Sequence, residues 1–308
     1  MKQVFRILSL ILVLTGLFSL AAFDRASAET VPEEEQKSEE ENLLPEMFGE
    51  KTFLGHKIKK TVKLENGGRD IYLSDFGKNH IIVPETVTSE TKIIIFGSCP
   101  SVAKWYALNR DAIAVIETPV MQQHFRLGVS EFVAELAEAT GTEKMLWFGF
   151  SAAARSVMDS LGCFLRESPE AAPQILILAD PEVGNQLNFT CIDSKFCTGD
   201  DRIELYVENG TRFLCLSKDD RLLYRTGVRK LIDNCEVTCL VSPFKEHSGT
   251  LNNSRGIVWN AVDRGIIELC LGERDSFDPE YQVLDTSLPA EDEAENGKSP
   301  AGGAAEQK

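Results

Sequence analysis

Short apolar runs alternate with helical patterns from Lys57 to Gly272. Six of these runs are apolar throughout, which is typical of strands buried on both faces of a parallel sheet. They cover residues 92–97, 112–117, 144–149, 174–180, 212–217 and 236–242. Two earlier segments, 56–65 and 69–76, alternate apolar and polar positions around Asn-Gly-Gly and predict an antiparallel hairpin, and residues 80–85 resemble a third short strand.

Segments whose apolar residues have helical spacing separate most of these strands. Apolar residues recur three and four positions apart within 130–141, after Ser151, and within 221–234 and 254–272. Ser130 is a candidate N-cap, and Gly141 is a candidate C-terminal stop. We therefore expect one α/β domain over residues 51–274. It would have a mostly parallel central sheet of about eight strands, helices on both faces and an N-terminal antiparallel hairpin.

The first 28 residues have the pattern of a secretory signal peptide. Lys2 and Arg6 precede a sixteen-residue apolar run, and Ala26-Ser27-Ala28 forms a small-x-small cleavage site. The run is short for a spanning helix, which needs about 20 residues. The pattern predicts cleavage near Ala28, export to the periplasm or the outside, and no membrane association of the mature chain.

The net charge of −16 lies mainly in the two tails. Residues 29–50 and 275–308 are acidic and poor in apolar side chains, which predicts two disordered flanks. Residues 51–274 carry a net charge of only −3 and no basic cluster. A nucleic-acid partner is therefore not expected.

Eight cysteines in an exported chain permit disulfides. Cys191 and Cys197 share one polar loop and form the best local pair, whereas Cys163, Cys215 and Cys270 lie on apolar faces as candidate buried thiols. No Cys/His group has the spacing of a zinc site, so we expect no metal.

The strand at 144–149 runs into Gly-Phe-Ser-Ala-Ala before a helix. Gly149 and Ala153 are small enough for a sharp strand-to-helix turn. Such a turn would expose Ser151 at a helix N-terminus, where negative charge is favoured. Ser151 is thus a candidate nucleophile, which needs a base and a group that orients that base.

Functional sites in an open α/β sheet lie at the carboxyl ends of the strands. Of the four histidines, His247 follows the last strand and is the candidate base. Asp219 and Asp220 follow the strand at 212–217, and Asp180 follows the strand at 174–180. Any of the three is a candidate acid.

The order Ser151, Asp220, His247 on successive strand ends resembles the α/β-hydrolase superfamily, over roughly residues 57–272. The resemblance implies that Ser151 is the nucleophile and His247 the general base and acid. It makes Asp220 the orienting acid, with Asp219 and Asp180 as rivals. It places the oxyanion donors at the backbone N–H groups of Ala152 and Ser98, with Cys99 as the rival of Ser98. Two departures from the family are Ala153 in the elbow and a loop 96–101 without the His-Gly pair.

The activity implied by the resemblance is hydrolysis of an ester, thioester or amide by an acyl-enzyme, without a cofactor. The segment 181–210 has too few apolar residues for a large helical lid, which favours a small-molecule or polymer-end acyl substrate in an open site. Two alternatives remain. The first is a non-catalytic binding or scaffold protein of the same fold. The second is a thioredoxin-like redox protein that uses Cys99, which follows the strand at 92–97.

Overall fold

A computed structural model describes residues 41–118, 128–181, 199–220, 223, 226–244 and 256–287. Its strands form one sheet in the order β1-β2-β3-β4-β6-β5-β7-β8-β9-β10-β11. The strands are β1 (Thr52–Phe53), β2 (His56–Lys63), β3 (Arg69–Leu73), β4 (His80–Val83), β5 (Lys92–Gly97), β6 (Ala112–Glu117), β7 (Met145–Phe150), β8 (Ile175–Ala179), β9 (Arg212–Ser217), β10 (Glu236–Val241) and β11 (Gln282–Val283).

Six adjacent strands, from β6 across to β10, run parallel and form the centre of the sheet. Strands β1 to β4 pair antiparallel on one side, and β11 pairs antiparallel with β10 on the other. The prediction of a parallel centre with an antiparallel N-terminal part is confirmed. The expectation of about eight strands was too low, because β1 and β11 are two residues long and too short to show a periodic pattern.

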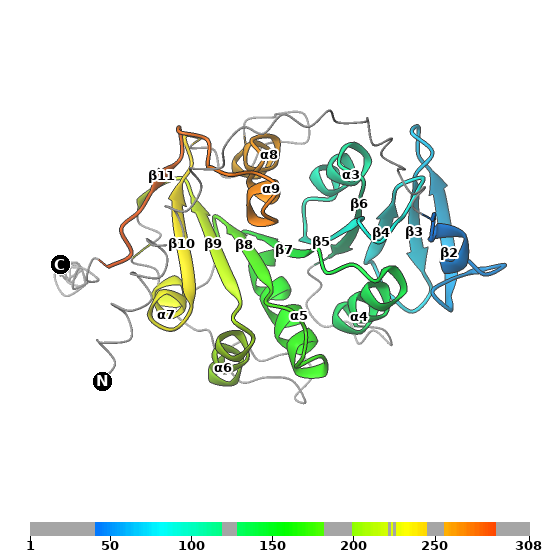
Figure 1. Ribbon diagram of the computed structural model, residues 1–308, viewed down its shortest axis with the longest axis horizontal. Coiled ribbons are helices and arrows are strands. Elements are labelled where there is room, and N and C mark those ends of the chain that lie inside the picture. The colour runs from blue at the N-terminus through cyan, green and yellow to red at the C-terminus, as the bar shows by residue number, and fades with distance from the viewer. Residues whose placement is uncertain are drawn as a thin grey trace, which may run out of the picture. The chain divides into compact units, whose positions relative to one another are not determined.

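Helices cover both faces of the sheet (Figure 1). The helices are α2 (Leu44–Met47), α3 (Pro100–Asn109), α4 (Val129–Thr140), α5 (Ala153–Glu167), α6 (Gly199–Asn209), α7 (Thr226–Asn234), α8 (Ile257–Asp263) and α9 (Ile266–Cys270). Helices α3, α8 and α9 lie on one face, and α4 to α7 lie on the other (Figure 1). A separate apolar core fills each face, as expected for strands that are buried on both sides.

Two predicted helix details were wrong. Ser130 lies inside α4 and is buried, and Gly128 is the N-cap, where its N–H donates to the Glu131 carboxylate at 3.1 Å. The single helix expected over 254–272 is broken into α8 and α9 at Gly265, which has a φ of +73°. Gly141 ends α4 in the left-handed conformation, as predicted.

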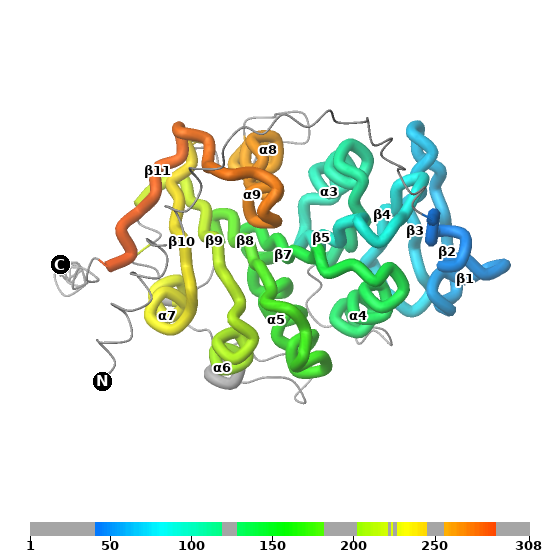
Figure 2. Tube along the Cα trace, in the orientation of Figure 1, coloured from blue at the N-terminus to red at the C-terminus, as the bar shows by residue number. Residues whose placement is uncertain are grey.

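The folded part extends beyond residues 51–274 at both ends. Leu44 and Met47 of α2 are buried, and the N–H of Leu43 donates to the carbonyl of Val87 at 2.7 Å. At the other end Tyr281 is buried, and the chain runs beside β10 as β11 (Figure 2). The predicted boundaries were therefore wrong by about ten residues, because a few apolar side chains anchor otherwise acidic segments. The remainder of both predicted tails, and the predicted signal peptide, lie outside the described residues.

Strand β5 is the point where the order of the sheet reverses. The chain passes from β5 to β6 on one side and then crosses to β7 on the other side of β5. Helices α3 and α5, which follow β5 and β7, lie on opposite faces of the sheet (Figure 1). The carboxyl ends of β5 and β7 therefore form a topological switch point, the usual place for a site in an open α/β sheet.

Candidate functional site

Ser151 lies in a sharp turn between β7 and α5, at the switch point beside β5. Its φ is +51°, a left-handed conformation that is uncommon for a residue other than glycine. The turn is held by two backbone bonds: the Ser151 N–H donates to the carbonyl of Ala179 at 3.1 Å, and its carbonyl accepts from the N–H of Ala154 at 3.2 Å. The predicted strand-to-helix turn is confirmed, and its strain is of the kind that gathers at functional sites.

Close approach of α5 to the sheet explains the small residues around this turn. A Cβ at Gly149 would lie 2.6 Å from the Cα of Ala154, and a Cβ at Gly97 would lie 2.9 Å from the carbonyl oxygen of Ala153. Gly97 and Gly149 are register partners on β5 and β7. Two glycines on neighbouring strands thus let the first turn of α5 pack directly against the sheet. This packing fixes the position of Ser151 relative to the carboxyl ends of β5 and β7.

The loop after β5 carries the second half of the predicted oxyanion site. Ser98 and Cys99 have φ values of +64° and +60°, and α3 begins at Pro100. The Ser98 N–H donates to the carbonyl of Glu117 at 2.9 Å, so this group is already engaged. The N–H of Cys99 has no acceptor among the described residues, and neither has that of Ala152 at the start of α5. The geometry thus favours Cys99, the rival, over Ser98.

Backbone strain is concentrated at this edge of the sheet. Ser98, Cys99, Ser151 and Asp180 all have positive φ, and they follow the adjacent strands β5, β7 and β8. Each such residue costs on the order of 1–3 kcal/mol and persists only where the surroundings enforce it. Strain shared by three neighbouring loops marks their carboxyl ends as one site.

The three candidate acids differ in burial. Asp180 is 2% exposed, and its N–H donates to the carbonyl of Leu216. Asp219 is half-buried, and its N–H donates to the Ser217 hydroxyl at 3.4 Å, whereas Asp220 is exposed. A carboxylate that orients a catalytic histidine is normally buried. Burial therefore ranks Asp180 and Asp219 above Asp220, although all three lie at the carboxyl edge of β8 or β9.

The predicted base and the predicted disulfide cannot be placed. His247, Cys191 and Cys197 lie outside the described residues. His80 and His56 are the first residues of β4 and β2, and the antiparallel pairing places both at the same edge of the sheet as the carboxyl end of β6. Their strands lie three and five places from β7 in the sheet order, and each ring is bonded to carboxylates. Neither histidine therefore lies on a strand next to that of Ser151.

Cys99 lies in a buried environment that disfavours its thiolate form. Burial raises the pKa of its thiol to about 12, whereas a reactive cysteine needs a lowered pKa. The six described cysteines are all thiols rather than disulfides, and the described residues contain no group of three or more metal-ligating side chains. No helix in the described parts of the chain is long and apolar enough to span a membrane.

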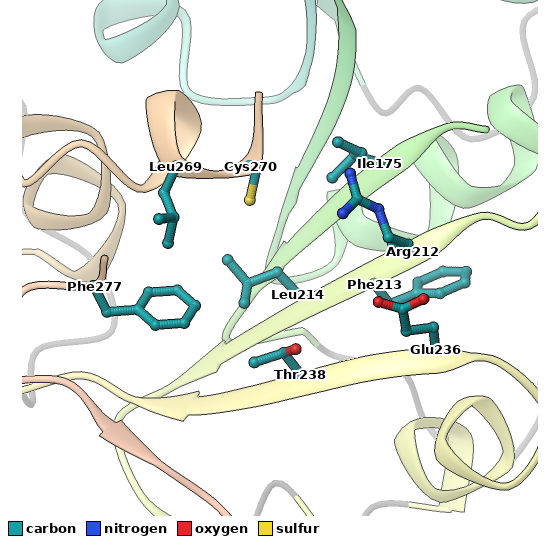
Figure 3. A pocket seen from close by; sticks show the side chains of 9 residues that line it. All are labelled: Ile175, Arg212, Phe213, Leu214, Glu236, Thr238, Leu269, Cys270 and Phe277. Atoms are coloured by element: carbon teal, nitrogen blue, oxygen red, sulfur yellow. The ribbon is translucent and has the colours of Figure 1, made fainter. Parts of the chain in front are cut away.

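A cavity of about 140 Å³ lies at the opposite edge of the sheet (Figure 3). Its polar wall includes Arg212 and Glu236, the first residues of β9 and β10. At roughly 3.3 Å per strand residue this edge is about 15 Å from the carboxyl ends. The other lining residues are Ile175, Phe213, Leu214, Thr238, Leu269, Cys270 and Phe277. The cavity is therefore separate from the turn at Ser151.

Glu117 is a residue at the Ser151 edge that sequence reasoning missed. It ends β6 beside Gly97, and its side chain accepts a hydrogen bond from the hydroxyl of Ser160 on α5 at 3.0 Å. In the sequence it is the last residue of the apolar run 112–117. The one signal in the sequence is a carboxylate at the carboxyl end of a buried strand.

Comparison with known proteins adds a likeness of fold. The sequence matches no protein-family model and no curated protein. Among solved structures, the chain is similar to a tributyrin phosphonate-inhibited esterase B from Lactobacillus rhamnosis (10% identity, 68% of this chain and 87% of that one, TM-score 0.39). It is also similar to fungal esterases from Rhizomucor miehei (12%, 72% and 88%, TM-score 0.41). A third is EstE1, a carboxylesterase cloned from a metagenomic library (10%, 75% and 91%, TM-score 0.39). At these values the likeness carries no argument about activity, which must come from the residues of this chain.

Proposed function

We propose that this protein is an exported serine hydrolase that cleaves an ester, thioester or amide through an acyl-enzyme. The observation that carries the proposal is the strained turn at Ser151. This turn lies at the start of α5, at the switch point beside β5. Export rests on the sequence of residues 1–28 alone.

The proposed reaction begins with attack of the Ser151 Oγ on the acyl carbon of the substrate. His247 takes the hydroxyl proton and later delivers it to the leaving group, and water then hydrolyses the acyl-enzyme with His247 again as the base. His247 follows β10, the next strand beyond β9, so its loop leaves from the same edge of the sheet.

The oxyanion of the tetrahedral intermediate would be held by the backbone N–H groups of Ala152 and Cys99. Two facts support this pair. Each N–H lacks an acceptor in the described part of the chain, and each belongs to the second residue after the carboxyl end of its strand, β5 or β7. Such a donor is worth about 3–4 kcal/mol of transition-state stabilisation.

The orienting acid is proposed to be Asp220, by its place in the chain order Ser, Asp, His. Asp219 and Asp180 are the alternatives, because both are more buried than Asp220. The substrate class proposed is a small molecule or a polymer end that carries an acyl group. The sequence support is the low apolar content of residues 181–210, within which α6 accounts for Gly199–Asn209.

A fluorophosphonate probe tests the proposal, because it phosphonylates an activated serine and displaces fluoride. We expect the wild type and Cys99→Ala to be labelled and Ser151→Ala to remain unlabelled, with all three folded by circular dichroism. Labelling that persists in Ser151→Ala would refute Ser151 as the nucleophile. A folded wild type that is never labelled would favour a non-catalytic binding protein.

A further inference from the structure

We propose that Glu117 is a positioning residue, which holds the oxyanion loop after β5 in register with the helix that carries Ser151. This inference rests on the proposed function. Glu117 contacts the loop through its backbone and the helix through its side chain, and it does not touch the reacting atoms.

The backbone contact fixes the loop. The carbonyl of Glu117 accepts the N–H of Ser98 at 2.9 Å, and Glu117 is the register partner of Gly97. Ser98 and Cys99 form two consecutive left-handed residues, a conformation that costs energy and needs external support. The end of β6 provides that support on one side, and α3, which begins at Pro100, provides it on the other.

The side-chain contact fixes the helix. The Ser160 hydroxyl of α5 donates to Glu117 Oε1 at 3.0 Å. Ser160 lies two turns after Ala153, on the same helix that begins at the elbow. A shift of β6 relative to α5 would therefore move Cys99 relative to Ala152, and both proposed donors would no longer point at one oxyanion.

The carboxylate is held there at a cost. Glu117 Oε2 is inaccessible to solvent and has no hydrogen-bond partner among the described residues. Burial raises the pKa of Glu117 to about 7, the bond from Ser160 lowers it, and the charge of Asp159 raises it. A buried carboxylate oxygen without a partner lowers the stability of the fold, and a purely structural contact would not require this loss.

The other titratable groups around Glu117 are few. Asp159 faces it from α5 and pairs with Arg202 of α6. Cys99 follows β5 by two residues, and burial raises the pKa of its thiol to about 12. From β4, His80 is paired with Asp70 at 2.7 Å, and the adjacent Asn79 accepts the N–H of Thr118.

A double-mutant cycle on Glu117 and Ser160 tests the inference. Labelling of Ser151 in the wild type is measured first, because its absence refutes the proposed function before Glu117 is considered. We then expect Glu117→Ala to lower kcat on a p-nitrophenyl ester by about tenfold to a hundredfold, with little change in KM, because displaced catalytic groups cost rates of that size. Ser160→Ala should lower kcat as well, and the double variant should be no worse than the worse single variant.

Two further variants separate positioning from folding. Glu117→Gln keeps an acceptor for Ser160 and should restore most of kcat. Glu268 of α9 also has a buried Oε2 without a partner in the described region, so Glu268→Ala is the matched control and should lower thermal stability without lowering kcat of the folded fraction. Additive losses at Glu117 and Ser160, no rescue by Gln, or losses that merely track the folded fraction would overturn the inference.

Discussion

The backbone N–H of Ser98 donates a hydrogen bond to the carbonyl oxygen of Glu117 at 2.9 Å. This bond joins the carboxyl ends of β5 and β6 and removes Ser98 from the available oxyanion donors. The next N–H in the loop, that of Cys99, has no acceptor among the described residues. The proposed oxyanion site therefore consists of backbone N–H groups at two positions, Cys99 and Ala152.

Replacement of Ala152 by lactic acid tests the oxyanion site, since an ester linkage removes only the N–H. We expect kcat to fall by about 10²–10³-fold, with little change in KM, because the donor acts on charge that develops in the transition state. The same replacement at Ala137, within α4, removes a helix N–H and should affect stability alone. Equal kcat values for the two backbone-ester variants would exclude the N–H of Ala152 as an oxyanion donor.

Gly149→Ala tests the close approach of α5 to β7. The added Cβ would lie 2.6 Å from the Cα of Ala154, and backbone must move to relieve that contact. We expect a loss of about 1–3 kcal/mol in the free energy of unfolding, together with reduced labelling of Ser151. Urea unfolding monitored by circular dichroism measures the first effect.

Gly162→Ala, within α5, is the matched control for Gly149→Ala on β7. Its Cβ would meet Arg202 at 3.5 Å, an ordinary contact, and alanine favours a helix interior over glycine by up to about 1 kcal/mol. The variant should be as stable as the wild type or more so. If Gly149→Ala were tolerated equally well, the close packing of the elbow would not be required.

Much of this site follows from local patterns in the sequence. Six buried runs fix the parallel strands, and Gly149 with Ala153 marks a sharp turn before Ser151, because both signals lie within a few neighbouring residues. The Ser98–Glu117 bond could not be predicted. It depends on β6 lying beside β5, and that order of strands is set by packing across the whole sheet. The anchors at Leu44 and Tyr281 were missed because single apolar residues within acidic segments leave no periodic signal.

The acid can be assigned by conversion of each candidate to its amide. Asp220→Asn is expected to lower kcat/KM by about 10³–10⁴-fold, because an amide cannot hold the histidine in the required tautomer. Asp219→Asn and Asp180→Asn should have much smaller effects. A large loss in Asp180→Asn with a small one in Asp220→Asn would move the acid to β8, as burial favours.

His56 should make stability depend on pH. Partial burial lowers its pKa, but hydrogen bonds from its ring to Glu135 at 2.7 Å and to Asp75 at 3.1 Å raise the pKa above 6.5 overall. A histidine whose pKa is raised on folding stabilises the protein fully below pH 6.5, and this contribution is lost as the pH rises through the folded-state pKa.

His56→Gln should remove this dependence. The free energy of unfolding of the wild type should fall between pH 6 and pH 9 by more than that of the variant, in urea titrations at each pH. Glu135→Gln should weaken the dependence without abolishing it, because Asp75 remains. Parallel pH profiles for the wild type and His56→Gln would show that the raised pKa has no effect on stability.

The most direct test of the central claim is mass spectrometry of the wild type after reaction with the fluorophosphonate. Trypsin releases residues 145–155 as one peptide, and Ser151 is its only hydroxyl-bearing residue. The account predicts that this peptide, and no other, carries the phosphonyl group, and that Ser151→Ala carries none. A modification on another peptide, or none on a folded wild type, would contradict it.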